Sequence, residues 1–432
     1  MLLSRQLCSA VALLALFLAP ASGPRGIASA PVAFDIPGRA DATPWIAASG
    51  SFVAVTWGAT AEGKTDVFAA VSRDGGVTFA APVQVNTVSG EARLGGEQPA
   101  RVALVRTRGA TIPEVVVLWT ARAEQTAIKV ARSRDGGRTF SAPVVLQASD
   151  AAGARGWPAV ALDPRGKVHA IWLDHRDMAA KPAAGAPSHT PGAAHDGVAM
   201  AQKSGLYYAS VTNGTAREHR ITRSVCYCCK TALAAGTDGT LYAAWRHVYP
   251  GDLRDMAFTM SRDAGRTFSP IVRVAEDHWA VNACPDDGPA LALDSRNDAR
   301  NVVHAVWPTV TEGANAQGAI FYASTADGRR FSPRIRIPTL GGPKPTHPQV
   351  VVDRSGRVIV AWDETVNGRR VSAAREIRVK GSAVPEFGEI VTIPANGPTA
   401  YPMLAATDTG LVAIWTTVGE PSRVELQPLV IR

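Results

Sequence analysis

One eight-residue pattern, Ser-x-Asp-x-Gly-x-Thr-Phe, recurs along the chain and constrains the fold more than any other feature. Three clean copies span residues 72–79, 133–140 and 261–268, and a degenerate copy spans 324–331. In each copy Asp and Gly predict a tight turn, because the Asp side chain can cap backbone N–H groups and Gly accepts a positive φ. The Phe is expected to pack beneath the turn. Repetition of this kind predicts an array of similar units.

A longer repeat surrounds this turn: an apolar strand, a second turn, and an alternating strand that ends in Trp. The clearest copies span 158–172 and 348–362. The seven copies end at Trp57, Trp119, Trp172, Trp245, Trp307, Trp362 and Trp415. Period-two alternation predicts strands, and no segment after the N-terminus has helical periodicity. Each copy therefore predicts four strands, with the Asp-containing turn between strands three and four.

These repeats predict an all-β fold, a seven-bladed β-propeller that occupies residues 31–432 as one domain. The last copy lacks a fourth strand, and residues 31–36 are expected to supply it and close the ring. A closed ring leaves only short, protected strand edges. Six blades plus an irregular pair of strands is the alternative.

Composition fits such a fold and narrows the choice of partners. The chain has 432 residues with 39 Gly and 30 Pro, as expected for a turn-rich β protein. Its formal net charge is +8, but no run of Lys or Arg and no basic helix is present, which argues against nucleic acid. An anionic small ligand or a glycan is the favoured kind of partner, and the sequence leaves the oligomeric state open.

The N-terminus predicts export. Residues 1–30 have a positive start at Arg5, an apolar core over 11–18, and small-residue cleavage sites at 19–21 or 28–30. The apolar core is too short to span a bilayer, and no later apolar stretch is long enough. We therefore expect a periplasmic or secreted protein. A segment at about 175–205, rich in Ala, Pro, Gly and His, is expected to be a flexible insertion, either a lid or a solvated excursion.

Blade geometry predicts where chemistry would occur. The Asp-containing turns share one face, whereas residues that precede strand one and follow the Trp share the other, a funnel. Its candidate catalytic residues are Asp174, Arg176, Arg254, Asp255 and Glu364. Its candidate ligand-binding residues are His175, Arg246, His247 and Trp279. Glu97, His347 and 284–287 also precede a strand one.

Four cysteines remain after removal of the signal segment: Cys226, Cys228, Cys229 and Cys284. Two disulfides are the first interpretation for an exported protein, with Cys228 or Cys229 bridged to Cys284 and a second bridge inside 226–229. That second bridge would close almost no loop. Four soft thiolate ligands would instead suit Cu(I) or Zn. A redox-active pair is the third alternative.

The Asp-containing turns resemble the Asp-boxes of the sialidase-like, BNR-repeat β-propellers. That resemblance implies exo-sialidase-like activity, for which the family uses three arginines, a Tyr–Glu nucleophile pair and an Asp acid/base. The first of those arginines belongs to a motif whose place is taken here by Phe34-Asp35-Ile36-Pro37, so Asp35 would repel a substrate carboxylate. Tyr401 superficially resembles the nucleophile, but 157–158, 347–348 and 401–402 are equivalent within the repeat, which makes it a blade feature.

A second resemblance is to exported proteins labelled sialidase family that share three motifs. They carry a Cys-x-Cys-Cys-x-Thr segment, here 226–231, a downstream Arg-Asp, here 254–255, and a Trp-x-x-x-x-Cys-Pro-x-x-Gly-Pro-Ala segment, here 279–290. The resemblance implies one site built from these segments with Arg246 and His247. Three functions follow as alternatives: binding of a ligand or metal at this cysteine-rich funnel site between blades four and five, glycoside hydrolysis by funnel carboxylates, or a protein-interaction platform.

Overall fold

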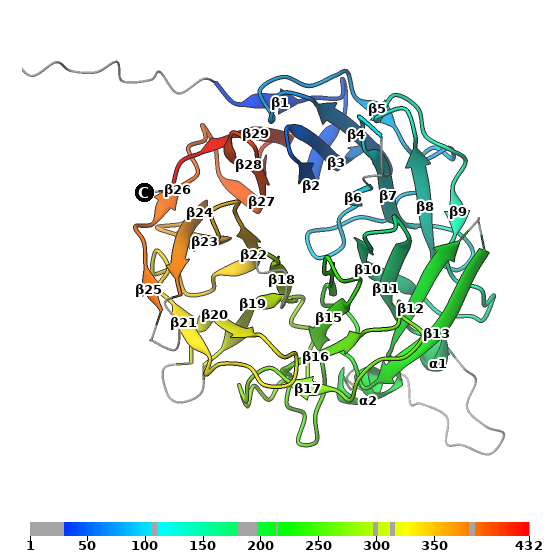
Figure 1. Ribbon diagram of the computed structural model, residues 1–432, viewed down its shortest axis with the longest axis vertical. Helices are drawn as coiled ribbons and strands as arrows, with labels where there is room; N and C mark the ends of the chain where they lie inside the picture. The colour runs from blue at the N-terminus through cyan, green and yellow to red at the C-terminus, as the bar shows by residue number, and fades with distance from the viewer. Residues whose placement is uncertain are drawn as a thin grey trace, which may run out of the picture. The chain divides into compact units, whose positions relative to one another are not determined.

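The computed structural model describes residues 30–105, 110–179, 197–212, 215–296, 301–311, 316–379 and 385–431. Within them, seven antiparallel sheets follow one another along the chain and form the blades of a β-propeller (Figure 1). The seven-bladed prediction is therefore confirmed, and the six-bladed alternative is wrong. The predicted signal segment lies outside the described residues except for Ala30.

Six blades use consecutive strands, numbered outwards from the ring centre. Blades one to three contain β2 (Ala40–Ser49), β3 (Phe52–Ala61), β4 (Lys64–Ser72) and β5 (Val83–Gln84); β6 (Arg101–Val105), β7 (Glu114–Ala121), β8 (Ala127–Ser133) and β9 (Val144–Val145); and β10 (Arg155–Leu162), β11 (Val168–Asp174), β12 (Gly205–Thr212) and β13 (Thr215–Arg223). Blades four to six contain β14 (Ala232–Ala235), β15 (Leu241–Arg246), β16 (Met256–Ser261) and β17 (Val272–Arg273); β18 (Ala290–Asp294), β19 (Val302–Val310), β20 (Gly318–Thr325) and β21 (Ile335–Ile337); and β22 (Thr346–Val352), β23 (Val358–Val366), β24 (Arg369–Arg378) and β25 (Glu386–Phe387), with β26 (Val391–Thr392) also paired to β24.

The seventh blade closes the ring with strands from both ends of the described chain. It contains β27 (Thr399–Thr407), β28 (Gly410–Thr417), β29 (Arg423–Leu429) and, outermost, β1 (Val32–Phe34). Val32 lies opposite Leu426 in this pairing, and Figure 1 shows the blue β1 beside the red β29. The predicted closure by residues 31–36 is confirmed. The inner strands β2 and β27 are in contact, so the ring has no open seam between its first and last blades.

The Asp-containing turns form as the repeat predicts. Ser261 Oγ donates to Asp263 Oδ1 (2.8 Å), and Thr267 Oγ1 donates to Oδ2 (2.6 Å). These contacts, led by the Thr267 hydroxyl, lower the pKa of Asp263 to about 2. Phe268 packs against the hydrophobic core beneath the turn. The equivalent carboxylates are those of Asp74, Asp135 and Asp327.

Every blade buries the Trp of its second strand, but each of these strands continues past the Trp, so the expectation that the strand ends there is wrong. All seven Trp side chains are fully buried, and each packs where neighbouring blades meet, as Trp119 does between blades one and two. A buried indole N–H needs an acceptor. Trp172, Trp245, Trp362 and Trp415 each donate to the side chain two residues further on, respectively Asp174, His247, Glu364 and Thr417. Trp57 and Trp307 donate to Asp41 and Asp277.

The predicted insertion departs from the expectation that no helix is present. Two short helices, α1 (Arg176–Ala179) and α2 (Gly197–Lys203), lie at its two ends, while residues 180–196 are outside the described part. A helix of one or two turns contains too few residues to give a helical hydrophobic period. Among the described residues, no helix is long and apolar enough to cross a membrane.

Candidate functional site

The starts of the innermost strands share an irregularity that shapes the centre of the ring. In four blades a non-glycine residue with positive φ stands directly before a proline: Thr43, Trp157, His347 and Tyr401. The pairing of strands one and two shifts register at each of these places. Such bulges re-aim side chains and cost conformational energy, so they are associated with sites. Tyr401 is thus the blade feature that the repeat indicates.

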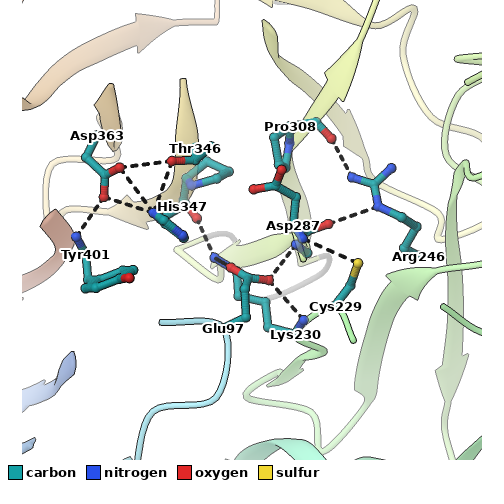
Figure 2. A network of polar contacts seen from close by, with 12 residues as sticks. Glu97, Cys229, Lys230, Arg246, Asp287, Pro308, Thr346, His347, Asp363 and Tyr401 are labelled. Carbon is teal, nitrogen blue, oxygen red and sulfur yellow. Dashed lines mark hydrogen bonds and ion pairs between the residues drawn. The ribbon is translucent and has the colours of Figure 1, made fainter. Parts of the chain in front are cut away.

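Polar contacts cross the ring axis between blades that are not neighbours. Glu97, which precedes β6 of blade two, accepts hydrogen bonds from the backbone N–H of Lys230 (3.0 Å) in blade four and of Gly288 (2.7 Å) in blade five (Figure 2). The Lys230 Nζ atom lies 3.5 Å from Glu97 Oε1 and donates to the carbonyl of Pro348 in blade six. A Cβ atom on Gly96 would lie 2.1 Å from the Tyr401 ring of blade seven.

We call the residues that meet there the central cluster. It comprises Glu97, Lys230, Asp286, Asp287, His347, Asp363 and Tyr401. Five blades contribute to it, and Figure 2 shows six of these side chains in one view. Glu97, Lys230, Asp287 and Asp363 are buried, whereas Asp286 is exposed and His347 and Tyr401 are half-buried. A ligand in the funnel would therefore meet the last three.

His347 is oriented by a fully buried carboxylate. Its Nδ1 atom lies 3.0 Å from Asp363 Oδ2, and the same oxygen accepts the backbone N–H of Tyr401 (2.7 Å). Thr346 and Arg370 donate to the other oxygen, Oδ1. His347 keeps the lone pair of Nε2 in the tautomer whose Nδ1 proton points at Asp363, whereas Arg370 Nη2, which can only donate, lies 3.0 Å from the same Nδ1 and favours the other tautomer. The Tyr401 ring packs edge-on against the imidazole, with centroids 4.6 Å apart.

Two neighbouring carboxyl groups in the cluster have raised pKa values, so they hold their protons to higher pH than an ordinary aspartate does. Burial, followed by the negative charge of Glu97, raises the pKa of Asp287 to about 6. The pKa of Asp286 is raised by the same two causes, desolvation of its carboxyl group and the charge of Glu97, although the residue as a whole is exposed. Burial lowers the pKa of Lys230, although the charge of Glu97 opposes that effect. Acids with raised pKa values beside a carboxylate are the arrangement from which proton donors are made.

The four cysteines come together between blades four and five. Cys228 forms a disulfide with Cys284, 56 residues further along, as one predicted pairing has it. Cys226 and Cys229 are free thiols whose Sγ atoms lie 3.3 Å apart, so the second predicted bridge is not formed. Three of the sulfurs lie within 4.8 Å of one another. A four-thiolate copper or zinc site would need Cys228 and Cys284 as separate thiolates, so metal binding stays a prediction that depends on reduction of this disulfide.

Arginines surround this cysteine segment. Arg254 NH1 donates to Cys226 Sγ (3.4 Å), and Arg246 donates to the carbonyls of Asp287, Arg254 and Pro308. The Arg246 guanidinium also lies over the Trp279 ring, 4.8 Å from its centroid. The predicted grouping of Arg246, Arg254 and Trp279 with the cysteines is thus present in the structure.

The two predicted histidines have apolar surroundings. His175 is buried between the rings of Trp157 and Tyr227, and burial lowers its pKa to about 4. His247 accepts the indole N–H of Trp245 and packs on Tyr249, and burial lowers its pKa to about 4. Neither joins the central cluster through a hydrogen bond between described residues.

The carboxylates predicted to be catalytic are occupied by structural partners. Asp174 accepts the indole N–H of Trp172 and is ion-paired to Arg155 and Arg176. Glu364 accepts the indole N–H of Trp362 and two backbone N–H groups. Asp255 is ion-paired to Arg273 and is fully buried. The three carboxylates do not form one site. Each makes contacts that stabilise the blade to which it belongs.

The residues that do meet on the axis carry a weaker sequence signal. Glu97, His347 and 284–287 are expected in the funnel from their position before a strand one, but nothing in the sequence ranks them above their neighbours. Asp363 follows Trp362 directly and Tyr401 repeats a blade position. The repeated pre-proline position, with a different side chain in each of these four blades, is a signal that could have identified His347 and Tyr401.

Comparison with known proteins gives the class of fold. No family model and no curated protein matches the chain. Among solved structures, an α-L-arabinofuranosidase from Fusarium graminearum in complex with an iminosugar inhibitor matches with a TM-score of 0.50 and 13% identity, over 94% of this chain and 99% of that one. An ulvan lyase bound to GlcA(1-4)Rha3S matches with a TM-score of 0.50 and 13% identity, over 79% of this chain and 81% of that one. A leech intramolecular trans-sialidase matches with a TM-score of 0.48 and 10% identity, over 87% and 83%.

The chain therefore has the β-propeller fold that such glycosidase and lyase structures share. It is a seven-bladed β-propeller with the central cluster on its axis and the cysteine segments at the edge of that cluster.

Proposed function

We propose that the protein cleaves the glycosidic bonds of an acidic glycan at the central cluster. One observation carries this proposal: an exposed acid with a raised pKa, Asp286, and a histidine held by a buried carboxylate, His347, interact at the ring axis. Glycoside cleavage needs a group that protonates the leaving oxygen and a second group that activates water. The fold, shared with glycan-active enzymes, supports the same class of substrate.

In this mechanism Asp286 protonates the glycosidic oxygen as the bond breaks. His347 takes a proton from the attacking water at Nε2, while Asp363 fixes the imidazole and stabilises its charged form. Tyr401 offers a half-buried ring for a sugar to pack against. Glu97 keeps the proton on Asp286 through its negative charge.

The charges around the cluster favour an anionic glycan. Lys344 is exposed and lies 3.5 Å from Asp287, and Arg370 is partly exposed beside Tyr401. Guanidinium and ammonium groups pair with carboxylate and sulfate. The formal net charge of +8 acts in the same direction over longer range. We further propose that the enzyme acts outside the cytoplasm, on the strength of its N-terminal sequence.

The test is turnover of a panel of uronate-containing, sulfated and neutral glycans, followed by new reducing ends. We expect the wild type to act on an anionic member, and Asp286→Asn and His347→Gln each to lose about 100-fold or more in kcat. Asp252→Asn is the matched control, because Asp252 is an exposed aspartate with positive φ like Asp286. No turnover of any glycan, or equal loss in the control, would contradict the proposal. An unsaturated sugar in the product would show that the protein cleaves the bond by elimination and not by hydrolysis.

A further inference from the structure

The four sulfurs form a chain of contacts that runs from the buried interior to the surface. Cys226 Sγ lies 3.3 Å from Cys229 Sγ and 3.9 Å from Cys228 Sγ. Cys228 is bonded to Cys284. The first three cysteines are buried, whereas Cys284 is exposed. A free dithiol thus lies in contact with a disulfide whose far cysteine is an exposed residue.

The surroundings of Cys226 favour its thiolate. Arg254 is fully buried, and it donates to Cys226 Sγ and to the carbonyls of Val281 and Gly197. Among the described residues no carboxylate forms an ion pair with Arg254, so this sulfur is the group nearby that can supply a counter-charge. A buried cation without a partner is costly. The hydrogen bond from Cys229 is the largest cause that lowers the pKa of Cys226, and Arg254 acts in the same direction.

Cys229 has the complementary role. Burial, followed by its hydrogen bond to Cys226, raises the pKa of Cys229, opposite in direction to the shift of Cys226. The backbone N–H of Asp287 also donates to its sulfur (3.4 Å). One thiol of the pair is therefore arranged as nucleophile and the other as the group that resolves the first bond.

We propose that the four cysteines form a thiol–disulfide relay that moves a disulfide from Cys228–Cys284 to Cys226–Cys229 and back. In the first step the Cys226 thiolate attacks Cys228 Sγ, the Cys226–Cys228 bond forms, and Cys284 leaves as a thiolate that takes a proton from water. In the second step Cys229 gives up its proton and attacks Cys226 Sγ. Cys228 leaves and takes that proton.

The net reaction converts two thiols and one disulfide into two thiols and one disulfide, so no external oxidant or reductant is required. The reaction changes where the disulfide and the thiols lie. The disulfide becomes buried, and a thiol appears at the exposed Cys284. That thiol can attack a disulfide on another molecule, which would give the protein a redox activity separate from glycan cleavage.

The test is differential alkylation of the full-length protein without added reductant. Iodoacetamide is applied to the native protein, a heavy-isotope form is applied after denaturation, and peptide mapping locates both labels and both possible disulfides. We expect native label at Cys284 together with a Cys226–Cys229 disulfide that accumulates as label traps the product. Labelling only at Cys226 or Cys229 after denaturation, with Cys228–Cys284 intact, would overturn the relay.

Variants separate the relay from general opening of the structure. Cys226→Ser removes the nucleophile and should lower native labelling of Cys284 at least tenfold, and Cys229→Ser should lower it because the first step then reverses unresolved. Arg254→Gln should slow the labelling of Cys284. It should also shift to higher pH the range over which the labelling rate increases. Two fixed disulfides with no free thiol in the wild type, or four thiols that react only after a stoichiometric metal is removed, would each overturn the proposal without any variant.

Discussion

The Nδ1 atom of His347 lies 3.0 Å from Oδ2 of Asp363, and that carboxylate is fully buried beside an imidazole that is 14% exposed. The pair spans β22 and β23 of blade six, and the backbone N–H of Tyr401 in blade seven binds the same oxygen. Asp363 thereby ties two blades to the orientation of one histidine. This pair gives the central cluster an imidazole of fixed orientation, which distinguishes it from a set of solvated loop charges.

The first prediction concerns Asp363 as a positioning residue. Asp363→Asn leaves a side chain of the same shape but removes the charge that stabilises a protonated His347. We expect kcat to fall about 100-fold, with KM changed less than threefold, because the loss affects proton transfer and not substrate contact. Steady-state kinetics with the glycan that the wild type cleaves measure both. Equal changes in kcat and KM would point to a disturbed binding surface instead.

The second prediction concerns the pH dependence of the acid. Burial and the charge of Glu97 raise the pKa of Asp286, so activity should fall as the pH rises through that raised value and the donor loses its proton. Glu97→Gln removes one cause, and the alkaline limb of the pH–rate profile should then move to lower pH by roughly one unit. A profile of kcat/KM against pH tests the shift, and an unmoved limb would separate Glu97 from the chemistry.

Much of the fold is predictable from the sequence, because its repeats are local. The turn at Asp263 and the strand that contains Trp172 each depend on neighbouring residues. The last repeat has one predicted strand fewer than the others, which indicates that another segment completes its blade. The two short helices beside the insertion are not predictable, since α1 has four residues and carries no periodicity.

The site was only partly predictable, for a different physical reason. Sequence position identifies the funnel face but not the direction of a side chain. Asp174 and Glu364 follow a Trp by two residues, where the indole N–H needs an acceptor, and the repeated Trp-x-acceptor spacing was the available signal. The contact of Glu97 with Lys230 joins blades two and four and depends on closure of the whole ring.

The third prediction tests this structural role of Glu364. Glu364→Gln would direct an amide NH₂ at one of three N–H donors that now meet carboxylate oxygens. We expect a loss of about 2 kcal/mol in the free energy of unfolding, with activity per folded molecule unchanged. Urea denaturation and kinetics on the same preparation measure the two quantities. Full stability with lost turnover would restore Glu364 as a catalytic residue.

The fourth prediction concerns Asp41, which accepts the indole N–H of Trp57 inside blade one. Burial raises the pKa of Asp41 from 3.8 to about 6. Between these two pH values the folded protein therefore holds a proton that the unfolded chain has lost. Stability from this proton is therefore complete below about pH 4 and is lost as the pH rises through 6. Relative to Asp41→Asn, the wild type should lose about 2 kcal/mol of unfolding free energy between pH 4 and pH 7. Parallel stability curves for the two proteins would refute this.

The fifth prediction concerns the Cys228–Cys284 bond, which closes a loop of 56 residues between blades four and five. In the chain-entropy model such a loop contributes about 4 kcal/mol. Cys284→Ser should lower the unfolding free energy by about that amount, whereas Cys226→Ser should change it much less. Urea titrations of both variants without reductant provide the comparison, and equal losses would mean that the disulfide carries no special share of the stability.

Binding at the ring axis is the central claim, and isothermal titration calorimetry with an anionic oligosaccharide measures it most directly. The comparison needs the wild type, Tyr401→Ala in the central cluster, and Tyr249→Ala, a half-buried tyrosine that packs on His247 away from the cluster. We expect Tyr401→Ala to weaken Kd at least tenfold and Tyr249→Ala to leave it within twofold of the wild type. Equal affinities in all three proteins, or no binding to the wild type, would contradict a glycan site at the centre of the propeller.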